Sequence, residues 1–312
     1  MTASALADAL PADPILERRA LVQATARRSL GRRKALSAIM LGVCGLAFVI
    51  ASTVLVWIVY LLVSKGLQWM SVAFFTQDPQ SPTVFQPNNL GGIRNAIVGS
   101  LVIDGLAVAI AVPIGVLAGF LMAESENAFA NAVRTTTEVM TGLPSILFGI
   151  FIYEFMILKY HYHFSGMLGS FALAILMVPV IMKASEIAFR AVPHSLKEAG
   201  LSLGLSKGKV GSRIVAPAAV PGLLTAVLLA TSRAVGETAP LLWVIGNTYI
   251  TSWSLSKEQS AVPLSSIYNY FLNGTPQQQA FAWGSALFLV AVVLLLNLGS
   301  RLLAAFIQRE RR

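Results

Sequence analysis

The chain has 312 residues, of which 56% are hydrophobic and only 12% are charged. A soluble domain carries about 25% charged residues, so this composition excludes a chain that covers a water-facing surface with its own charges. It favours an integral membrane protein. The net charge is +9, but the basic residues cluster between apolar runs, which indicates membrane orientation rather than nucleic-acid binding. The single cysteine, Cys44, excludes an intrachain disulfide.

Six apolar runs are long enough to predict membrane-spanning helices. A helix needs about 20 apolar residues to cross the hydrocarbon layer. The runs are rich in glycine and small residues and do not alternate, which favours helices over a β-barrel. The first run is also too long for the apolar part of a cleavable signal peptide, which reaches about 15 residues. We therefore expect an all-α polytopic membrane protein with six transmembrane helices, at residues 36–63, 95–123, 136–158, 164–182, 218–246 and 280–303.

The Lys and Arg residues predict the orientation of these helices. With six spans both termini lie on one side, and that side would hold most of the basic residues. The opposite side would hold only Lys65, Arg94, Lys159 and Lys257. The positive-inside rule therefore places both termini in the cytoplasm. The predicted organisation is a basic cytoplasmic segment at 1–35, a first transmembrane helix at 36–63, an extracytoplasmic loop at 64–94 and a core of five helices at 95–310.

The cytoplasmic loop between the fourth and fifth predicted spans has the features of two short helices. Ser195 and Glu198 fit a capping box, and Gly204 fits a left-handed helix end. Ser206 can cap the second helix, which we expect to end before Pro217. Three interpretations are open from the residues alone: a solvated connector, a DNA-binding helix-turn-helix with no room to reach a groove, or a docking surface for a soluble cytoplasmic partner.

Two charged residues, Arg233 and Glu237, lie inside the fifth predicted span. They are four residues apart, so on a helix they share a face and can pair. Arg233 would lie about 18 Å along the axis from Pro221, near the middle of the membrane. A charge at that depth costs several kcal/mol unless it is paired or wetted. The pair could lock helices together, or it could line a wet path in which the guanidinium binds an oxyanion and Glu237 neutralises it between passages.

The same cytoplasmic loop, residues 184–217, resembles the EAA motif of binding-protein-dependent ABC importer permeases. That motif is Glu-Ala-Ala, three residues, Gly, nine residues and Ile-x-Leu-Pro; here Gly200 replaces the second Ala and Ala216 replaces Leu. In that family the loop inserts into a groove on the ATPase subunit. The resemblance implies that the ATPase-coupling residues are Glu198, Ala199, Gly200, Gly204, Ile214 and Pro217.

Three further stretches, 91–101, 142–149 and 232–242, resemble the PstA family of permeases from phosphate ABC transporters. The resemblance extends over most of residues 90–310. It implies the fold of a type I ABC importer permease in a bacterial plasma membrane, with inorganic phosphate as the substrate and Arg233 and Glu237 in its path. The implied partners are a second, PstC-like permease, two copies of a PstB-like ATPase, a PstS-like extracytoplasmic phosphate-binding protein and the lipid bilayer, with no nucleic acid.

No nucleotide site is visible in this sequence. The stretch from Gly204 to Lys209 lacks the spacing of a phosphate loop, and Val210 stands where a metal-binding hydroxyl belongs. We therefore expect no cofactor, metal site, catalytic residue or enzymatic activity, with ATP and magnesium bound by the partner ATPase.

Asp104, in the second predicted span, would repel an anion and receives no role. The alternatives are a permease for another oxyanion (molybdate or sulfate), the PstC-type subunit, and a secondary transporter or channel; a membrane enzyme would need a clustered nucleophile, base or metal set, which is not visible.

Overall fold

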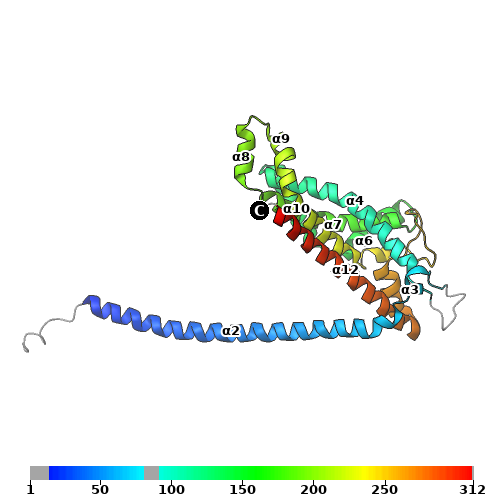
Figure 1. The fold of residues 1–312 in the computed structure, drawn as a ribbon, viewed down its shortest axis with the longest axis horizontal. Helices are drawn as coiled ribbons and strands as arrows, with labels where there is room; N and C mark the ends of the chain where they lie inside the picture. Colours follow the sequence, from blue (N-terminus) through cyan, green and yellow to red (C-terminus); the bar gives the residue numbers. More distant parts are fainter. Residues whose placement is uncertain (1–13, 81–90, 311–312) are drawn as a thin grey trace, which may run out of the picture. The chain divides into compact units, whose positions relative to one another are not determined.

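The structure, a computed structural model, describes residues 14–80 and 91–310, with side chains described between residues 33 and 302 of these ranges and at Phe306. Of the predicted basic segment 1–35, residues 1–13 lie outside the described residues. The described part is mostly helical, and its only β pairing is an isolated bridge between Pro79 and Gly91 (Figure 1). The predicted all-α fold is confirmed.

The chain divides into two compact units, residues 1–61 and 62–312. The described part of the first unit is helix α2 (Pro14–Gly66), which continues past residue 61 and begins well before the apolar run that predicted it. From residue 33 to residue 60 the apolar side chains of α2 are exposed on all sides, as at Leu41 and Phe48. A helix that is hydrophobic all round is typical of a membrane span.

The second unit contains the remaining helices, several of them short or irregular (Figure 1). In chain order these are η1 (Leu67–Trp69), α3 (Val72–Thr76), α4 (Arg94–Glu124), α5 (Ala128–Gly142), α6 (Ile146–Ile152), η3 (Tyr153–Lys159), α7 (Gly166–Arg190), α8 (His194–Ser202), α9 (Lys207–Val210), η4 (Gly211–Val215), α10 (Ala216–Val235), η5 (Leu241–Trp243), η6 (Val262–Asn269), α11 (Tyr270–Asn273) and α12 (Pro276–Glu310).

Five described helical segments are long and apolar enough to cross a membrane: Arg33–Trp69, Arg94–Glu124, Gly166–Arg190, Lys207–Val235 and Pro276–Leu302. The third predicted span, 136–158, is instead a pair of helices, Ala128–Gly142 and Ile146–Lys159, that meet at 104°. Leu143 is extended at the bend because Pro144 follows it, and the residue before a proline avoids helical geometry. Counted as one broken span, the pair is the sixth.

Helices α4 and α7 form the centre of the unit through a row of small residues. Ala107, Ala111, Gly115 and Gly119 follow one another at intervals of four along α4 and are buried. An added Cβ at Gly115 would lie 2.6 Å from a methyl carbon of Ile181 on α7, so only glycine permits this approach. Close backbone contact across small residues is the usual packing between helices in a membrane, where burial of apolar surface drives little association.

The fourth and fifth spans differ from their predicted bounds. Helix α7 ends at Arg190 rather than at residue 182. The fifth span begins at Lys207 and passes through Pro217, so the prediction that a helix ends before this proline was wrong. The π-helical segment η4 explains why the helix continues past Pro217, which has no N–H to donate. Just before this proline, the Ala216 N–H donates to the Gly211 carbonyl, five residues back, in the π-helical pattern.

Candidate functional site

Arg233 lies in the last turn of α10, where the end of the helix is covered on one side only. Its neighbours Ala230 and Ala234 are buried, whereas the Arg233 side chain is 54% exposed in the isolated chain. A cation in the last helical turn also interacts favourably with the helix dipole. The guanidinium is therefore held in place by a packed helix and is open on its outer side.

Glu237 pairs with Arg233 from beyond the helix end. The Arg233 Nε atom lies 3.5 Å from the Glu237 Oε1 atom, and the Glu237 side chain is only 18% exposed. The predicted pairing is thus present, but α10 ends at Val235 and Gly236 caps it. The prediction of a helix up to residue 246 was wrong because Gly236 and Pro240 both disfavour its continuation.

The segment after Glu237 is ordered without being a regular helix. The Ser165 N–H donates to the Val244 carbonyl at 3.0 Å, and the Gln259 N–H donates to the Ile245 carbonyl at 3.0 Å. Gly246 then turns the chain with a φ of +73°. Irregular backbone inside a membrane protein is tolerated where it is buried in protein or lines a water-filled cavity. We therefore expect the segment after Glu237 to have one of these two surroundings.

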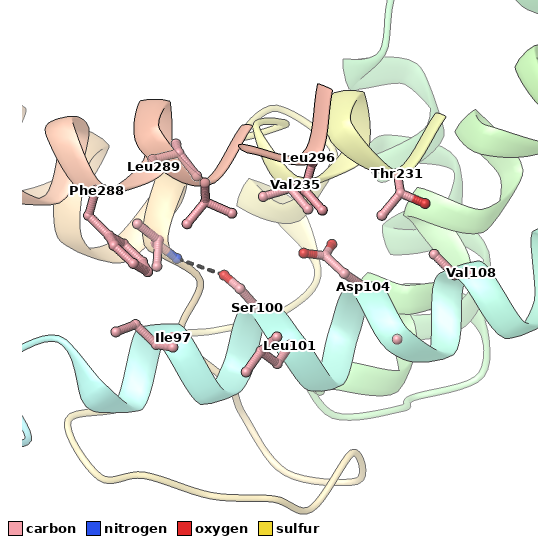
Figure 2. Close-up of a pocket in the computed structure, with 13 residues that line it drawn as sticks. Ile97, Ser100, Leu101, Asp104, Val108, Thr231, Val235, Phe288, Leu289 and Leu296 are labelled. Carbon is pink, nitrogen blue, oxygen red and sulfur yellow. Dashed lines mark hydrogen bonds between the residues drawn. The ribbon is translucent and has the colours of Figure 1, made fainter. Parts of the chain in front are cut away.

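A cavity of about 520 Å³ lies on the other side of α10, between α4, α10 and α12. Figure 2 shows Asp104 of α4 facing Thr231 and Val235 of α10 across it. Arg233 lies two residues from each of these on the helix, so its side chain leaves α10 on the opposite side. The cavity is otherwise almost entirely apolar, and among the described residues Asp104 has no hydrogen-bond or ion-pair partner. The Asp104 cavity and the Arg233 pair are therefore separate features.

The second part of the predicted site is the loop that contains α8 and α9. These helices project together from the end of the unit at which α12 finishes (Figure 1). Glu198 and Ala199 lie on α8 and are exposed, and Gly204 follows with a φ of +77°, the predicted left-handed helix end. The predicted capping box is absent: Pro193 occupies the N-cap position of α8, and Ser195 lies inside the helix. Ser206 is the N-cap of α9 but makes no side-chain capping bond.

Gly200 joins α8 to the helical segment that follows. It is buried, and an added Cβ would come within 2.5 Å of the Ile214 Cδ1 atom and 3.0 Å of the Val210 Cγ2 atom. The Leu205 N–H also donates to the Gly200 carbonyl at 3.2 Å. Gly200 and Ile214, which the motif places far apart in sequence, are thus in contact, and α8 is fastened to the base of the fifth span.

The outer surface of this loop is apolar as well as charged. Leu196 and Leu201 on α8 are each 44% exposed, and Leu203 just after it is 82% exposed. Exposed leucines grouped on a projecting loop are typical of a surface that interacts with a protein or with a membrane. Glu198 lies among them with an exposed carboxylate, and Pro217 lies at the base of the loop.

The chain is similar to known transport proteins over most of its length. Residues 111–312 match the family of binding-protein-dependent transport system inner membrane components. The chain is 36% identical over 272 residues to the phosphate transport system permease protein PstA of Haemophilus influenzae, covering 86% of this chain and 94% of the relative. It is 36% identical over 253 residues to PstA of Yersinia pestis, covering 80% and 84%.

The chain belongs to this transport family, among the PstA permeases. Its fold is similar to that of a chain of the MetNI methionine ABC transporter in an inward-facing conformation, with a TM-score of 0.53 at 17% identity over 67% of this chain and 94% of that one. At this identity the likeness concerns the fold alone. As a PstA permease the chain is a multi-pass membrane protein with the fold of a type I ABC importer permease.

Sequence analysis missed two charged clusters of this PstA permease. In the loop predicted to be extracytoplasmic, Arg94 Nη2 lies 3.0 Å from Asp78 Oδ2, and the Thr251 N–H donates to the same oxygen at 3.0 Å. Burial alone would raise the pKa of Asp78, but the hydrogen bonds from Arg94 and Thr251 outweigh it and hold the pKa below its usual value.

The second missed cluster surrounds Glu186 near the end of α7, where Arg134 and Arg190 converge on one buried carboxylate. Position 186 is separated from 134 by more than 50 residues, and no short motif connects them. The signal available in the sequence was an acidic residue within one helical turn of Lys183 and Arg190. Only the packing of α5 against α7 identifies Arg134 as a further partner.

Proposed function

We propose that this chain is the transmembrane permease subunit of an ATP-driven importer for inorganic phosphate. The observation that carries the proposal is the exposed guanidinium of Arg233, which ends a transmembrane helix in a PstA permease and is balanced by Glu237. A planar guanidinium offers two parallel N–H donors to the oxygens of phosphate. Arg233 and Glu237 are the proposed substrate-path residues, at the seam with a second, PstC-like permease.

The proposed path uses both members of the pair. Glu237 neutralises Arg233 when no anion is present, which lowers the cost of keeping a charge within the membrane. When phosphate arrives, the guanidinium exchanges its carboxylate partner for phosphate oxygens. A hydrogenphosphate ion also carries an O–H that can donate to Glu237, whereas sulfate has none at neutral pH. This difference favours phosphate over the sulfate alternative.

Energy must come from outside this chain. Moving two negative charges inward against 100 mV costs about 4.6 kcal/mol. In the proposed assembly, two PstB-like ATPase subunits bind ATP and magnesium, and this chain has no cofactor or enzymatic activity of its own. A PstS-like protein delivers phosphate from outside, and both termini of the chain lie in the cytoplasm of a bacterium. The proposed ATPase contact comprises Glu198, Ala199, Gly200, Gly204, Ile214 and Pro217.

The experiment is uptake of radiolabelled phosphate into proteoliposomes that contain the purified complex of this chain with its co-purifying subunits. We expect uptake that requires ATP on the cytoplasmic side and the binding protein on the other. Unlabelled phosphate should compete, whereas sulfate and molybdate at the same concentration should not. Competition by molybdate or sulfate at the level of phosphate would contradict the assignment of the substrate, and ATP-independent uptake would contradict the importer.

A further inference from the structure

A buried carboxylate near the coupling loop, Glu186, is surrounded by three cations. Its side chain is only 6% exposed. The Glu186 Oε1 atom lies 3.1 Å from Arg134 Nε of α5 and 3.0 Å from Arg190 Nη2 of α7, and its Oε2 atom lies 4.0 Å from Lys183 Nζ. A carboxylate so deeply buried is stable only where ion pairs and hydrogen bonds compensate its lost hydration. Glu186 therefore holds α5 and α7 in one arrangement at this point.

The same two arginines also hold the end of α4. Arg134 Nη2 donates to the Met122 carbonyl at 2.8 Å, and Arg190 Nη2 donates to it at 3.3 Å. Met122 is within the last four residues of α4, whose carbonyls have no partner inside the helix. Cations at a helix C-terminus are also favoured by the helix dipole. The cluster thus joins the ends of α4 and α7 to the middle of α5.

The coupling helix α8 is attached to this cluster by two connections. Arg190 is the last residue of α7, and α8 begins at His194, only a short turn later. On α8 itself, Lys197 Nζ forms an ion pair with Glu124 Oε1, and Glu124 is the last residue of α4. Any displacement of α8 is therefore applied to the ends of α4 and α7, where the Glu186 cluster lies.

From the Glu186 cluster, α5 and α6 extend toward the substrate-path pair of Arg233 and Glu237. Helix α5 continues through the 104° bend into α6. On α6, an added Cβ at Gly149 would come within 2.4 Å of the Pro240 carbonyl oxygen, so the two backbones are in direct contact. Pro240 lies three residues after Glu237. Farther along, the ring of Tyr153 lies 5.6 Å from that of Trp243.

We propose that Glu186 is a positioning residue that couples the movement of α8 to α5 and α6, and through them to the segment that holds Glu237. The proposal rests on the proposed function, because it assumes that α8 receives the movement of an ATPase. Packed elements joined by an ion-pair cluster with alternative arrangements can carry such coupling. Loss of the Glu186 charge should leave α8 free to move without moving α5.

The test measures phosphate transported per ATP hydrolysed by the full complex in proteoliposomes, for the wild type and for Glu186→Gln. The variant keeps the size of the side chain but removes its charge. We expect ATP hydrolysis to continue while the transport ratio falls at least about tenfold, because a broken buried pair is strongly unfavourable. Glu138→Gln is the matched control: this acid of α5 also pairs with Lys183 but is 61% exposed, and the ratio should stay at the wild-type value.

A second variant, Arg134→Lys, provides the test if the Glu186→Gln complex does not assemble. Arg134→Lys keeps the charge but cannot reach both Glu186 and the Met122 carbonyl with a fixed fork of donors, so it should also lower the ratio. An unchanged ratio in an assembled Glu186→Gln complex, or in Arg134→Lys if the first does not assemble, would overturn the inference. A wild-type complex that carries no phosphate would instead overturn the proposed function.

Discussion

Arg233 and Glu237 form an ion pair of 3.5 Å across the end of a transmembrane helix, with Arg233 in the last turn and Glu237 beyond the capping Gly236. This arrangement differs from two charges on one continuous helix. Glu237 lies beyond the last residue of α10, and its N–H donates to the Ala234 carbonyl at 3.0 Å, so its position is set by the turn that ends the helix.

Arg233→Gln should abolish most phosphate uptake while the complex still assembles. Loss of hydrogen bonds to a charged group costs about 1.5–3 kcal/mol, which corresponds to about a 10- to 150-fold lower rate if the anion meets Arg233 at the barrier. Radiolabelled uptake measures the loss, and co-purification of the partner subunits measures assembly. Arg301→Gln is the control, because Arg301 is an exposed cation of α12. Wild-type uptake by Arg233→Gln would remove the pair from the path.

Glu198→Lys should separate ATP hydrolysis from transport. The Glu198 carboxylate is exposed on α8 beside leucines, and reversing its charge at the proposed docking surface would replace attraction to a complementary partner charge by repulsion, so the transport ratio should fall at least about tenfold. The measurement is phosphate uptake and ATP hydrolysis in the same vesicles. Glu126→Lys, an exposed acid in the turn between α4 and α5, is the control and should retain the wild-type ratio. Equal coupling in both variants would argue against docking through α8.

Gly204→Ala should weaken the loop that follows α8, whereas Gly208→Ala should not. Both glycines have open space where a Cβ would be placed, but only Gly204 has a positive φ, of +77°. A side chain in the left-handed region costs about 1–2 kcal/mol, and alanine in place of a helical glycine gains about 0.5–1 kcal/mol. Hydrogen exchange across residues 194–210 should therefore be faster in the first variant and equal or slower in the second. The same rate in both would contradict the strained turn.

Gly204 also illustrates which features of the structure could be predicted from the sequence alone. Its left-handed turn follows from local chemistry, as do the positions of the long apolar helices, because an apolar run of sufficient length has few other options. The end of α10 was missed because apolar residues continue to Ile245, and length outweighed the weaker signals of Gly236 and Pro240. The bend at Pro144 was missed for the same reason.

Contacts between distant segments could not be predicted at all. The Gly149–Pro240 contact, and the Glu186 cluster that links α4, α5 and α7, depend on how helices are placed in three dimensions. No periodicity within one helix contains that information. The candidate site was therefore predicted as two separate local motifs, whereas the structure provides the helices that connect them.

The ion pair of Asp78 with Arg94 should persist at neutral pH and disappear in acid. The folded-state pKa of Asp78 lies below its usual value, so the carboxylate contributes stability that is present above the unfolded pKa and is lost as the pH falls below about 4. Asp78→Asn should remove the ion pair at every pH. Exchange of the Thr251 amide, which donates to Asp78, should then be faster than in the wild type at pH 7. Lys257→Gln, in the same loop as Thr251, should not change this exchange rate, and slow exchange in both variants would contradict the role of the ion pair.

Asp104→Leu should leave phosphate uptake within about twofold of the wild type and raise the unfolding temperature by a few degrees, because it removes an unpaired acid from an apolar cavity. The cavity opens on the side of α10 opposite to Arg233, so a path that runs past Arg233 does not enter it. Uptake in proteoliposomes and thermal unfolding in detergent measure the two effects. Thr231→Val, a change of similar size in the same cavity, is the control for altered packing. If Asp104→Leu lost uptake as severely as Arg233→Gln while Thr231→Val did not, the carboxylate would belong to the transport cycle, and the separation of the two features would be wrong.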